Sequence, residues 1–172
     1  MNIEFRMSEE ESFSRGRLEE RGIYHVTLDD MKPKESKAGN QMVAWTVRVQ
    51  HGDNKGQAAY GQIMLRKADG STYPYTAQQW GRLLRGVGYT PVEAEQLLKE
   101  GFSDSDDNDL PTFAEWTRDN LLGREGWIEF TPSIGEDSFP RIEWVAAKEA
   151  QSRKAIAAEA AAAREDMDDM PF

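Results

Sequence analysis

The sequence predicts a mainly β protein, a small five-stranded barrel with helices inserted between its third and fourth strands. Three observations predict this fold class. Apolar and polar residues alternate in five short segments, which is the period of a half-buried strand. Apolar residues recur at helical spacing between the third and the fourth of these segments. The chain has 172 residues, of which 38% are hydrophobic, and this suffices for one modest core.

Three strands are expected in the first half of the chain. The first follows Gly22, where apolar and polar residues alternate. The second covers residues 41–50 and the third residues 57–66. Residues 51–56 between them contain Gly, Asp and Asn, so these two strands are expected to form a hairpin. Residues 32–40 contain Pro, Gly, Asn and Ser, which predicts a loop after the first strand.

Three helices and two further strands are expected next. Each predicted helix begins with Thr and has Gln or Glu three residues later, which is the pattern of a capping box. The three threonines are Thr76, Thr90 and Thr112, and the glycines expected to end the helices are Gly88, Gly101 and Gly123. The last two strands are expected at residues 125–131 and 139–145.

The two ends of the chain differ from this central part in composition. Residues 1–21 are polar and charged, which predicts a loose N-terminal arm with at most one short strand, at residues 3–5. Residues 146–163 contain ten alanines and almost no apolar stripe, so we expect a solvated or fraying helix. The predicted organisation is therefore the arm, a central domain at residues 22–146, and an Ala-rich linker with an acidic interaction tail at residues 147–172.

The order of these elements is that of the OB-fold, a Greek-key barrel with five strands and a helical element between the third and the fourth. In that fold the loops after strands one and four flank a face that binds nucleic acid. Residues 32–40 would form the first of these loops and residues 132–138 the second. Another small α+β domain with a polar loop is the alternative that strand order leaves open.

Composition excludes several classes of protein. No apolar run approaches the roughly 20 residues that span a bilayer. The first residues lack the apolar stretch of a secretory signal. There is no Cys, which excludes thiolate nucleophiles and zinc–thiolate sites. There are only two His, which leaves few residues for His-based catalysis or metal binding. We therefore expect a cytoplasmic binding protein that is not an enzyme and needs no cofactor.

Five oxygen-bearing residues have the spacing of a calcium loop, at positions one, three, five, nine and twelve: Asp104, Asp106, Asn108, Thr112 and Glu115. However, Asp109 stands where such a loop needs Gly, and Pro111 interrupts the backbone that follows. Glu115 is also explained by the capping box. We therefore expect a solvated acidic loop and no metal.

Charge is unevenly distributed along the chain. There are 21 basic and 31 acidic residues, which gives a net charge of −10, yet residues 31–67 hold seven basic residues and only two acids. This segment therefore carries +5. A cationic segment in an acidic protein can form a nucleic-acid site.

Aromatic residues near these cations are candidates for base stacking. Tyr60 lies on the strand face opposite to the apolar one. Trp45 shares a face with three valines, so core packing and base stacking both remain open for it. The predicted DNA-binding residues are Lys32, Lys34, Lys37, Trp45, Arg48, Lys55, Tyr60, Arg66, Lys67, Phe139 and Arg141.

The end of the chain combines acidic residues with a terminal aromatic one. Phe172 can fill an apolar pocket while carboxylates meet cations on its rim, and the preceding Pro lowers the ordering cost of docking. The predicted partner-binding residues are Asp166, Asp168, Asp169, Met170, Pro171 and Phe172.

These last residues resemble the C-terminal tip of bacterial single-stranded DNA-binding proteins, which recruits replication, recombination and repair proteins. The body resembles phage-encoded single-stranded DNA-binding proteins of the OB-fold type. That resemblance is carried by four segments in order: GIYHV at residues 22–26, SKAGNQM at 36–42, LGREGW at 122–127 and FPRI at 139–142. The Ala-rich linker and the long helical insert depart from the bacterial pattern and put the bacterial tetramer in doubt.

The resemblance implies sequence-independent binding of single-stranded DNA in replication, recombination and repair, in the cytoplasm of the bacterial host if the protein is phage-encoded. A homo-oligomer is compatible with it, and no membrane partner is expected. Two alternatives remain open at this point. One is an acidic DNA mimic or inhibitor that binds a DNA-handling protein, and the other is an RNA-binding OB-fold protein.

Overall fold

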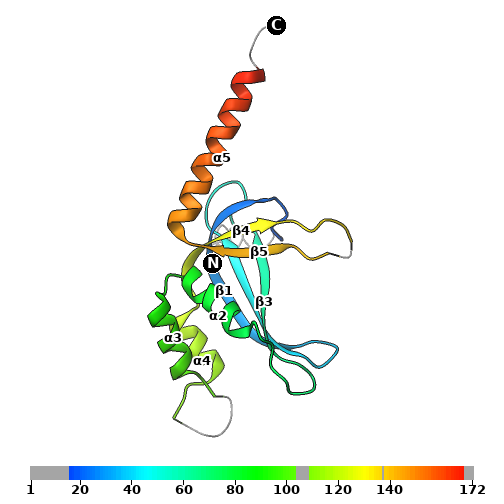
Figure 1. The fold of residues 1–172 in the computed structure, drawn as a ribbon, viewed down its shortest axis with the longest axis vertical. Coiled ribbons are helices and arrows are strands. Elements are labelled where there is room, and N and C mark those ends of the chain that lie inside the picture. The colour runs from blue at the N-terminus through cyan, green and yellow to red at the C-terminus, as the bar shows by residue number, and fades with distance from the viewer. Residues whose placement is uncertain (1–15, 104–108, 137, 169–172) are drawn as a thin grey trace, which may run out of the picture.

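The structure is a computed structural model that describes residues 16–103, 109–136 and 138–168 (Figure 1). Five antiparallel strands form one sheet, in the order β3-β2-β1-β4-β5, which curls into a half-barrel (Figure 1). β1 lies at the centre because it pairs with both β2 and β4. The five predicted strands are confirmed, and their bounds are β1 Gly22–Glu35, β2 Gln41–Val49, β3 Ala58–Arg66, β4 Glu125–Thr131 and β5 Arg141–Val145.

Four helices lie within the part of the chain that the structure describes. Three of them follow β3 in the chain, as predicted: α2 Thr76–Gly86, α3 Pro91–Glu100 and α4 Phe113–Asn120. α2 and α4 contact strands of the sheet, whereas α3 packs on α2. The fourth, α5 Ala147–Asp168, projects away from the sheet (Figure 1). Within the described ranges, no helix has both the length and the apolar character needed to cross a bilayer.

β1 is longer than predicted and includes residues 32–35, which the sequence pattern assigned to a loop. β1 still pairs with β2 at its last residue, Glu35, whereas its pairing with β4 covers only residues 22–27. The second half of β1 therefore has a neighbouring strand on one side only. Pro33 is tolerated there because an edge does not need the N–H that Pro lacks. The loop between β1 and β2 shrinks to residues 36–40.

The predicted helix starts are right at α3 and α4 and wrong in detail at α2. At α4, Thr112 and the Glu three residues later make the reciprocal pair of bonds of a capping box. At α3, the Thr90 side chain accepts a hydrogen bond from the N–H of Glu93. At α2 the N-cap is Tyr75, which makes no side-chain bond to the helix, and Thr76 lies inside the helix.

Thr76 and Gln79 bind the sheet instead of capping their own helix. The Thr76 hydroxyl donates to the carbonyl oxygen of Met64 at 2.5 Å, and the N–H of Met64 donates to the Gln79 side-chain oxygen at 2.9 Å. Met64 lies on β3, an end strand of the sheet, so the first turn of α2 satisfies backbone groups that such an edge exposes. Farther along this edge, residues 16–18 pair with Ala58, so this part of the expected N-terminal arm packs on the body.

The core lies between the inner face of the sheet and α2–α4. Trp45 and Trp144 contact each other there, with ring centroids 5.5 Å apart. Each tryptophan needs a glycine beside it, because a Cβ on Gly61 would lie 2.0 Å from the Trp45 ring and one on Gly86 2.6 Å from the Trp144 ring. A Cβ on Gly126 of β4 would lie 2.3 Å from the carbonyl oxygen of Gly86. The end of α2 therefore touches β4 backbone to backbone.

α5 is the Ala-rich helix expected from composition, and it contacts the sheet near its start. Ala150 is fully buried. The ammonium group of Lys154 lies 4.8 Å from the centre of the Trp127 ring, and Arg153 is paired with Glu129. Beyond Lys154 the described side chains of α5 are exposed. Only the first two turns therefore hold this helix on the sheet.

The close packing of Gly86 on Trp144 predicts opposite effects for two substitutions in α2. Gly86→Ala should lower the free energy of unfolding by about 1–3 kcal/mol, because the new methyl group overlaps the Trp144 ring. Gly81→Ala, also in α2, meets no atom within 4 Å and should raise it by up to about 1 kcal/mol through helix propensity. Urea unfolding measures both values. An equal gain in stability for the two variants would contradict the tight contact.

Candidate nucleic-acid interface

The two faces of the half-barrel differ in chemistry. Along β1, β2 and β3 most apolar residues point into the core, and the residues that alternate with them form what we call the outer face, in which Met42 is also buried. Strand register places this outer face in three rows, about 7 Å apart along the strands. The rows are Asp30, Thr46 and Tyr60; Lys32, Ala44 and Gln62; and Lys34, Met42 and Met64.

Three side chains suited to nucleic acid are accessible on the outer face. Tyr60 is 52% exposed, as its predicted position on β3 required. Lys32 and Lys34 are both exposed. The ammonium group of Lys32 lies 3.3 Å from a carboxylate oxygen of Asp30, but a pair this exposed contributes little and is easily exchanged. Lys34 forms no ion pair with any described residue.

Arg17 adds a cation that the sequence analysis missed. Its guanidinium group lies over the Tyr60 ring, 5.2 Å from the ring centre. This contact arises because Arg17 forms a bridge with Ala58, two residues before Tyr60. Arg contributes cation–π contacts in many single-strand sites. No local pattern in the polar N-terminal stretch predicts that bridge, so sequence alone offered no signal for it.

Two loops bring further cations to one end of the outer face. The side-chain oxygen of Asn40, in the β1–β2 loop, accepts a hydrogen bond from the N–H of Ala68 at 3.0 Å. The β1–β2 loop and the loop that follows β3, which contains Ala68, consequently lie side by side (Figure 1). We call the cations gathered there the basic tip: Lys34, Lys37, Arg66 and Lys67. Within the described ranges neither Lys37 nor Arg66 has an ion-pair partner, and Lys67 lies 5.5 Å from the centre of the Tyr73 ring.

One carboxylate in the same turn stays ionised beside the basic tip. The hydroxyl and the backbone N–H of Ser71 both donate to Asp69, and these bonds lower the pKa of the Asp69 carboxyl. The nearby charge of Lys67 acts in the same direction. Asp69 therefore offsets one cation at neutral pH, and the tip remains positive because its cations outnumber its acids.

Two predicted DNA-binding residues have structural roles instead. Arg48 donates from Nε to a carboxylate oxygen of Asp29 at 3.2 Å and from a terminal nitrogen to the carbonyl oxygen of Gly56 at 2.8 Å. It therefore ties β1, at its bulge, to the β2–β3 hairpin, and its donors are committed. Trp45 is only 5% exposed and packs over Gly61, so it offers no face to a base. Of the two interpretations open for Trp45, core packing is the one observed.

The structure does not gather the other three predicted residues at the basic tip. Lys55 is exposed in the β2–β3 turn, and the nine residues of β2 separate it from that end. Arg141, the first residue of β5, donates to the Glu143 carboxylate on its own strand. Phe139 is 92% exposed in the β4–β5 hairpin, just before β5 begins. The Phe139 ring is therefore accessible to a base.

The tail and the calcium-like spacing lie mostly beyond what the structure describes. Asp166 and Asp168 fall on the backbone of α5, whereas Asp169, Met170, Pro171 and Phe172 are outside the described residues. Asp104, Asp106 and Asn108 are also outside them, as is the strand expected at residues 3–5. Thr112 and Glu115 form the capping box of α4. Within the described ranges no cluster of His, Asp or Glu could hold a metal ion.

No model of a protein family matches the chain, and no curated protein matches it significantly.

Proposed function

We propose that this protein binds single-stranded DNA, largely independently of sequence, through the outer face and the basic tip. One observation carries the proposal: an acidic protein with a net charge of −10 holds exposed lysines and an exposed tyrosine together on one sheet face. Lysines neutralise phosphates and release counterions, which gives affinity without sequence information. Tyr60 supplies a stacking platform, which suits any base because every base has a π-face.

We also propose that the half-barrel is an OB-type fold. In that fold a partly open five-stranded barrel binds oligonucleotides on the face of strands two and three, between the loops after strands one and four. The strand order around β1 and the helices between β3 and β4 support it. The basic tip stands at the first of those loops. The second is the β4–β5 hairpin, where the exposed ring of Phe139 is available to a strand leaving the outer face.

We further propose that the acidic tail recruits other replication or recombination proteins, as its resemblance to bacterial tips implies, and that the protein acts in a phage context. The geometry of α5 supports a role for the tail away from the body. Its 22 residues span about 33 Å, and about 21 Å of this length lies beyond Lys154, the last contact with β4. The described end of α5 lies on the side of the molecule away from the loops that carry the basic tip (Figure 1).

Three lysines of the outer face and the basic tip provide the first test of DNA binding. Replacing Lys32, Lys34 and Lys37 with Ala should weaken single-strand binding similarly for all sequences. It should also reduce the slope of log affinity against log salt, by about 0.7 for each phosphate that the variant no longer neutralises. Fluorescence anisotropy titrations with an oligonucleotide at several salt concentrations measure both quantities.

A matched control removes the same charge elsewhere. Lys99, Arg118 and Lys148 are exposed on α3, α4 and α5, and their replacement by Ala should leave the slope unchanged. Equal slopes for the two triple variants would overturn the assignment of this face. If the unmodified protein binds no oligonucleotide but captures a DNA-handling protein through its acidic surface, the DNA-mimic alternative is correct. Tighter binding of a ribo-oligonucleotide than of its deoxy counterpart would favour RNA.

Tyr60 provides the second test. Tyr60→Ala should cost about 1–3 kcal/mol of binding free energy if a base stacks there, whereas Tyr60→Phe keeps the ring and should bind as the unmodified protein does. Both variants should unfold at nearly the same temperature, because the side chain is half exposed. Equal binding by the Ala and Phe variants would exclude stacking on this ring.

The tail provides the third test. Phe172→Ala should weaken capture of a host protein that recognises bacterial single-strand-binding tails by about 2 kcal/mol or more, the range of an anchor residue. Removal of residues 170–172 should have the same effect and should not alter thermal unfolding. Pull-downs and calorimetry measure the two outcomes. Undiminished capture of the partner by the truncated chain would show that the tail is not the docking element.

A further inference from the structure

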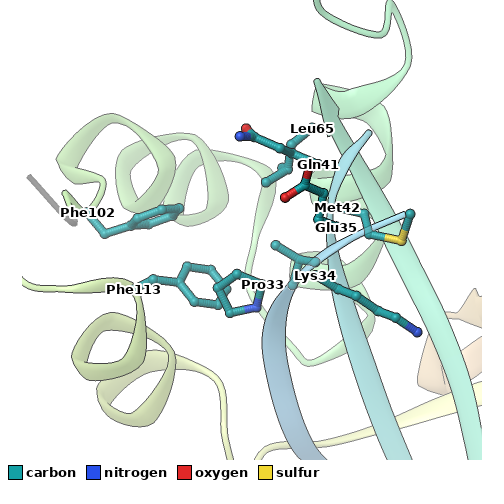
Figure 2. A pocket seen from close by; sticks show the side chains of 9 residues that line it. Pro33, Lys34, Glu35, Gln41, Met42, Leu65, Phe102 and Phe113 are labelled. Carbon is teal, nitrogen blue, oxygen red and sulfur yellow. The ribbon is translucent and has the colours of Figure 1, made fainter. Parts of the chain in front are cut away.

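A pocket of about 400 Å³ opens between the basic-tip end of the sheet and the helical insert (Figure 2). This volume falls in the range of small-molecule sites. Residues from β1, β2 and β3 form one side, and residues flanking the start of α4 form the other. Its lining residues are Pro33, Lys34, Glu35, Gln41, Met42, Val43, Leu65, Phe102 and Phe113.

The walls of the pocket are apolar and include aromatic rings held by the core. Phe113 is 3% exposed, and the Phe102 ring meets it edge to face at 4.8 Å. Phe102 also contacts the buried Trp116, with ring centroids 5.2 Å apart. On the opposite side lie Pro33 and Leu65 (Figure 2). The packing of Phe102 and Phe113 against Trp116 gives the site a preformed aromatic wall.

Two polar side chains face the pocket, and the ammonium group of Lys34, which also lines it, points away. Glu35 and Gln41 face each other across the β1–β2 ladder, and both are exposed. Figure 2 shows the Glu35 carboxylate and the Gln41 amide directed toward the space beside Phe102, whereas the Lys34 ammonium group points away from it. Lys34 belongs to the outer face, so the pocket adjoins the surface proposed to carry the DNA backbone.

We infer that this pocket receives one base of the bound strand, an inference that rests on the proposed function. A nucleobase is flat and apolar on its faces, and it carries donors and acceptors along one edge. Phe102 can stack on the face while Glu35 and Gln41 bond the edge. The phosphate of the same nucleotide then lies outside, on the side of Lys34.

The polar groups also specify which bases fit. The Glu35 carboxylate only accepts hydrogen bonds, so it selects bases with exocyclic amino groups, such as cytosine. Thymine presents a carbonyl oxygen where cytosine has its amino group, so a carboxylate placed to accept from that amino group is opposed by an acceptor in thymine. The pocket therefore adds a preference at one nucleotide to binding that is otherwise independent of sequence.

The test compares labelled oligo-dC and oligo-dT of equal length by anisotropy. The unmodified protein should bind oligo-dC at least about fivefold more tightly, the lower end of the discrimination that a good base contact provides. Glu35→Gln should bring this ratio toward one without changing the salt slope. Glu93→Gln, an equal charge change on exposed α3, should preserve the ratio. Phe102→Leu, which keeps an apolar side chain but removes the π-face, should weaken binding to both oligonucleotides.

The outcomes separate this inference from the proposed function. If oligo-dC and oligo-dT bind equally, and Glu35→Gln behaves as Glu93→Gln does, the base pocket is wrong, although DNA binding by the outer face stands. If neither oligonucleotide binds, the proposed function fails and the inference fails with it. If a peptide of residues 167–172 binds the unmodified protein but not Phe102→Leu, while the dC preference is absent, the pocket belongs to the tail of another copy and the inference is overturned.

Discussion

The backbone contact between the end of α2 and β4 determines how this half-barrel is closed. The sheet leaves β3 and β5 at its two ends, and α2 joins them from inside. At its first turn the helix satisfies the edge of β3 through Thr76 and Gln79. At its last residue, the carbonyl oxygen of Gly86 leaves no room for a side chain at Gly126, and the Trp144 side chain leaves none at Gly86 itself. The helix thereby replaces part of a missing strand ladder, and the two core tryptophans pack beneath it.

This way of closing the sheet determines where a ligand can bind. The helical insert covers most of the inner face, whose apolar side chains are buried, so only the part that lines the pocket beside Phe102 remains open to a ligand there. The outer face and the basic tip remain, and they carry a concentration of cations on a chain that is acidic elsewhere. In the proposed function, an anionic strand would be attracted to this surface and repelled by the rest of the molecule, so the charge distribution would orient the encounter as well as strengthen it.

Local patterns predicted what depends on local physics. The bounds of β4 and the capping box at Thr112 were both correct, because alternation and capping involve residues a few positions apart. The pattern at Thr76 was misleading, since the same Thr and Gln can bond their own helix or a strand packed against it. The sequence pattern predicts a loop at residues 32–35, which include Pro33. In the structure Pro33 lies in β1, at a position where β1 pairs with β2 but no longer with β4, and local sequence does not show where that pairing ends.

Contacts between distant segments explain the remaining differences in the candidate site. Alternation correctly put Arg48 off the apolar face, but its partners Asp29 and Gly56 come from other elements. Arg17 lies over Tyr60 because it forms a β-bridge with Ala58, and no pattern in the polar N-terminal stretch predicts that bridge. Sequence therefore indicated which strand faces are polar, and the tertiary fold decided which of their side chains are free to bind.

The Ala-rich helix α5 acts as a spacer of nearly fixed length. A flexible linker of the same 22 residues would have a root-mean-square span of about 26 Å and would let its end sweep through all the space near the body. The helix instead holds its end about 33 Å from its start and confines it to a narrow shell. If many copies bind one strand as proposed, the ends of their α5 helices would stand in an outer layer, clear of that strand. A partner recruited by the C-terminal residues would then meet a dense array of binding sites, whose effective concentration depends on the spacing of the copies and little on chain flexibility.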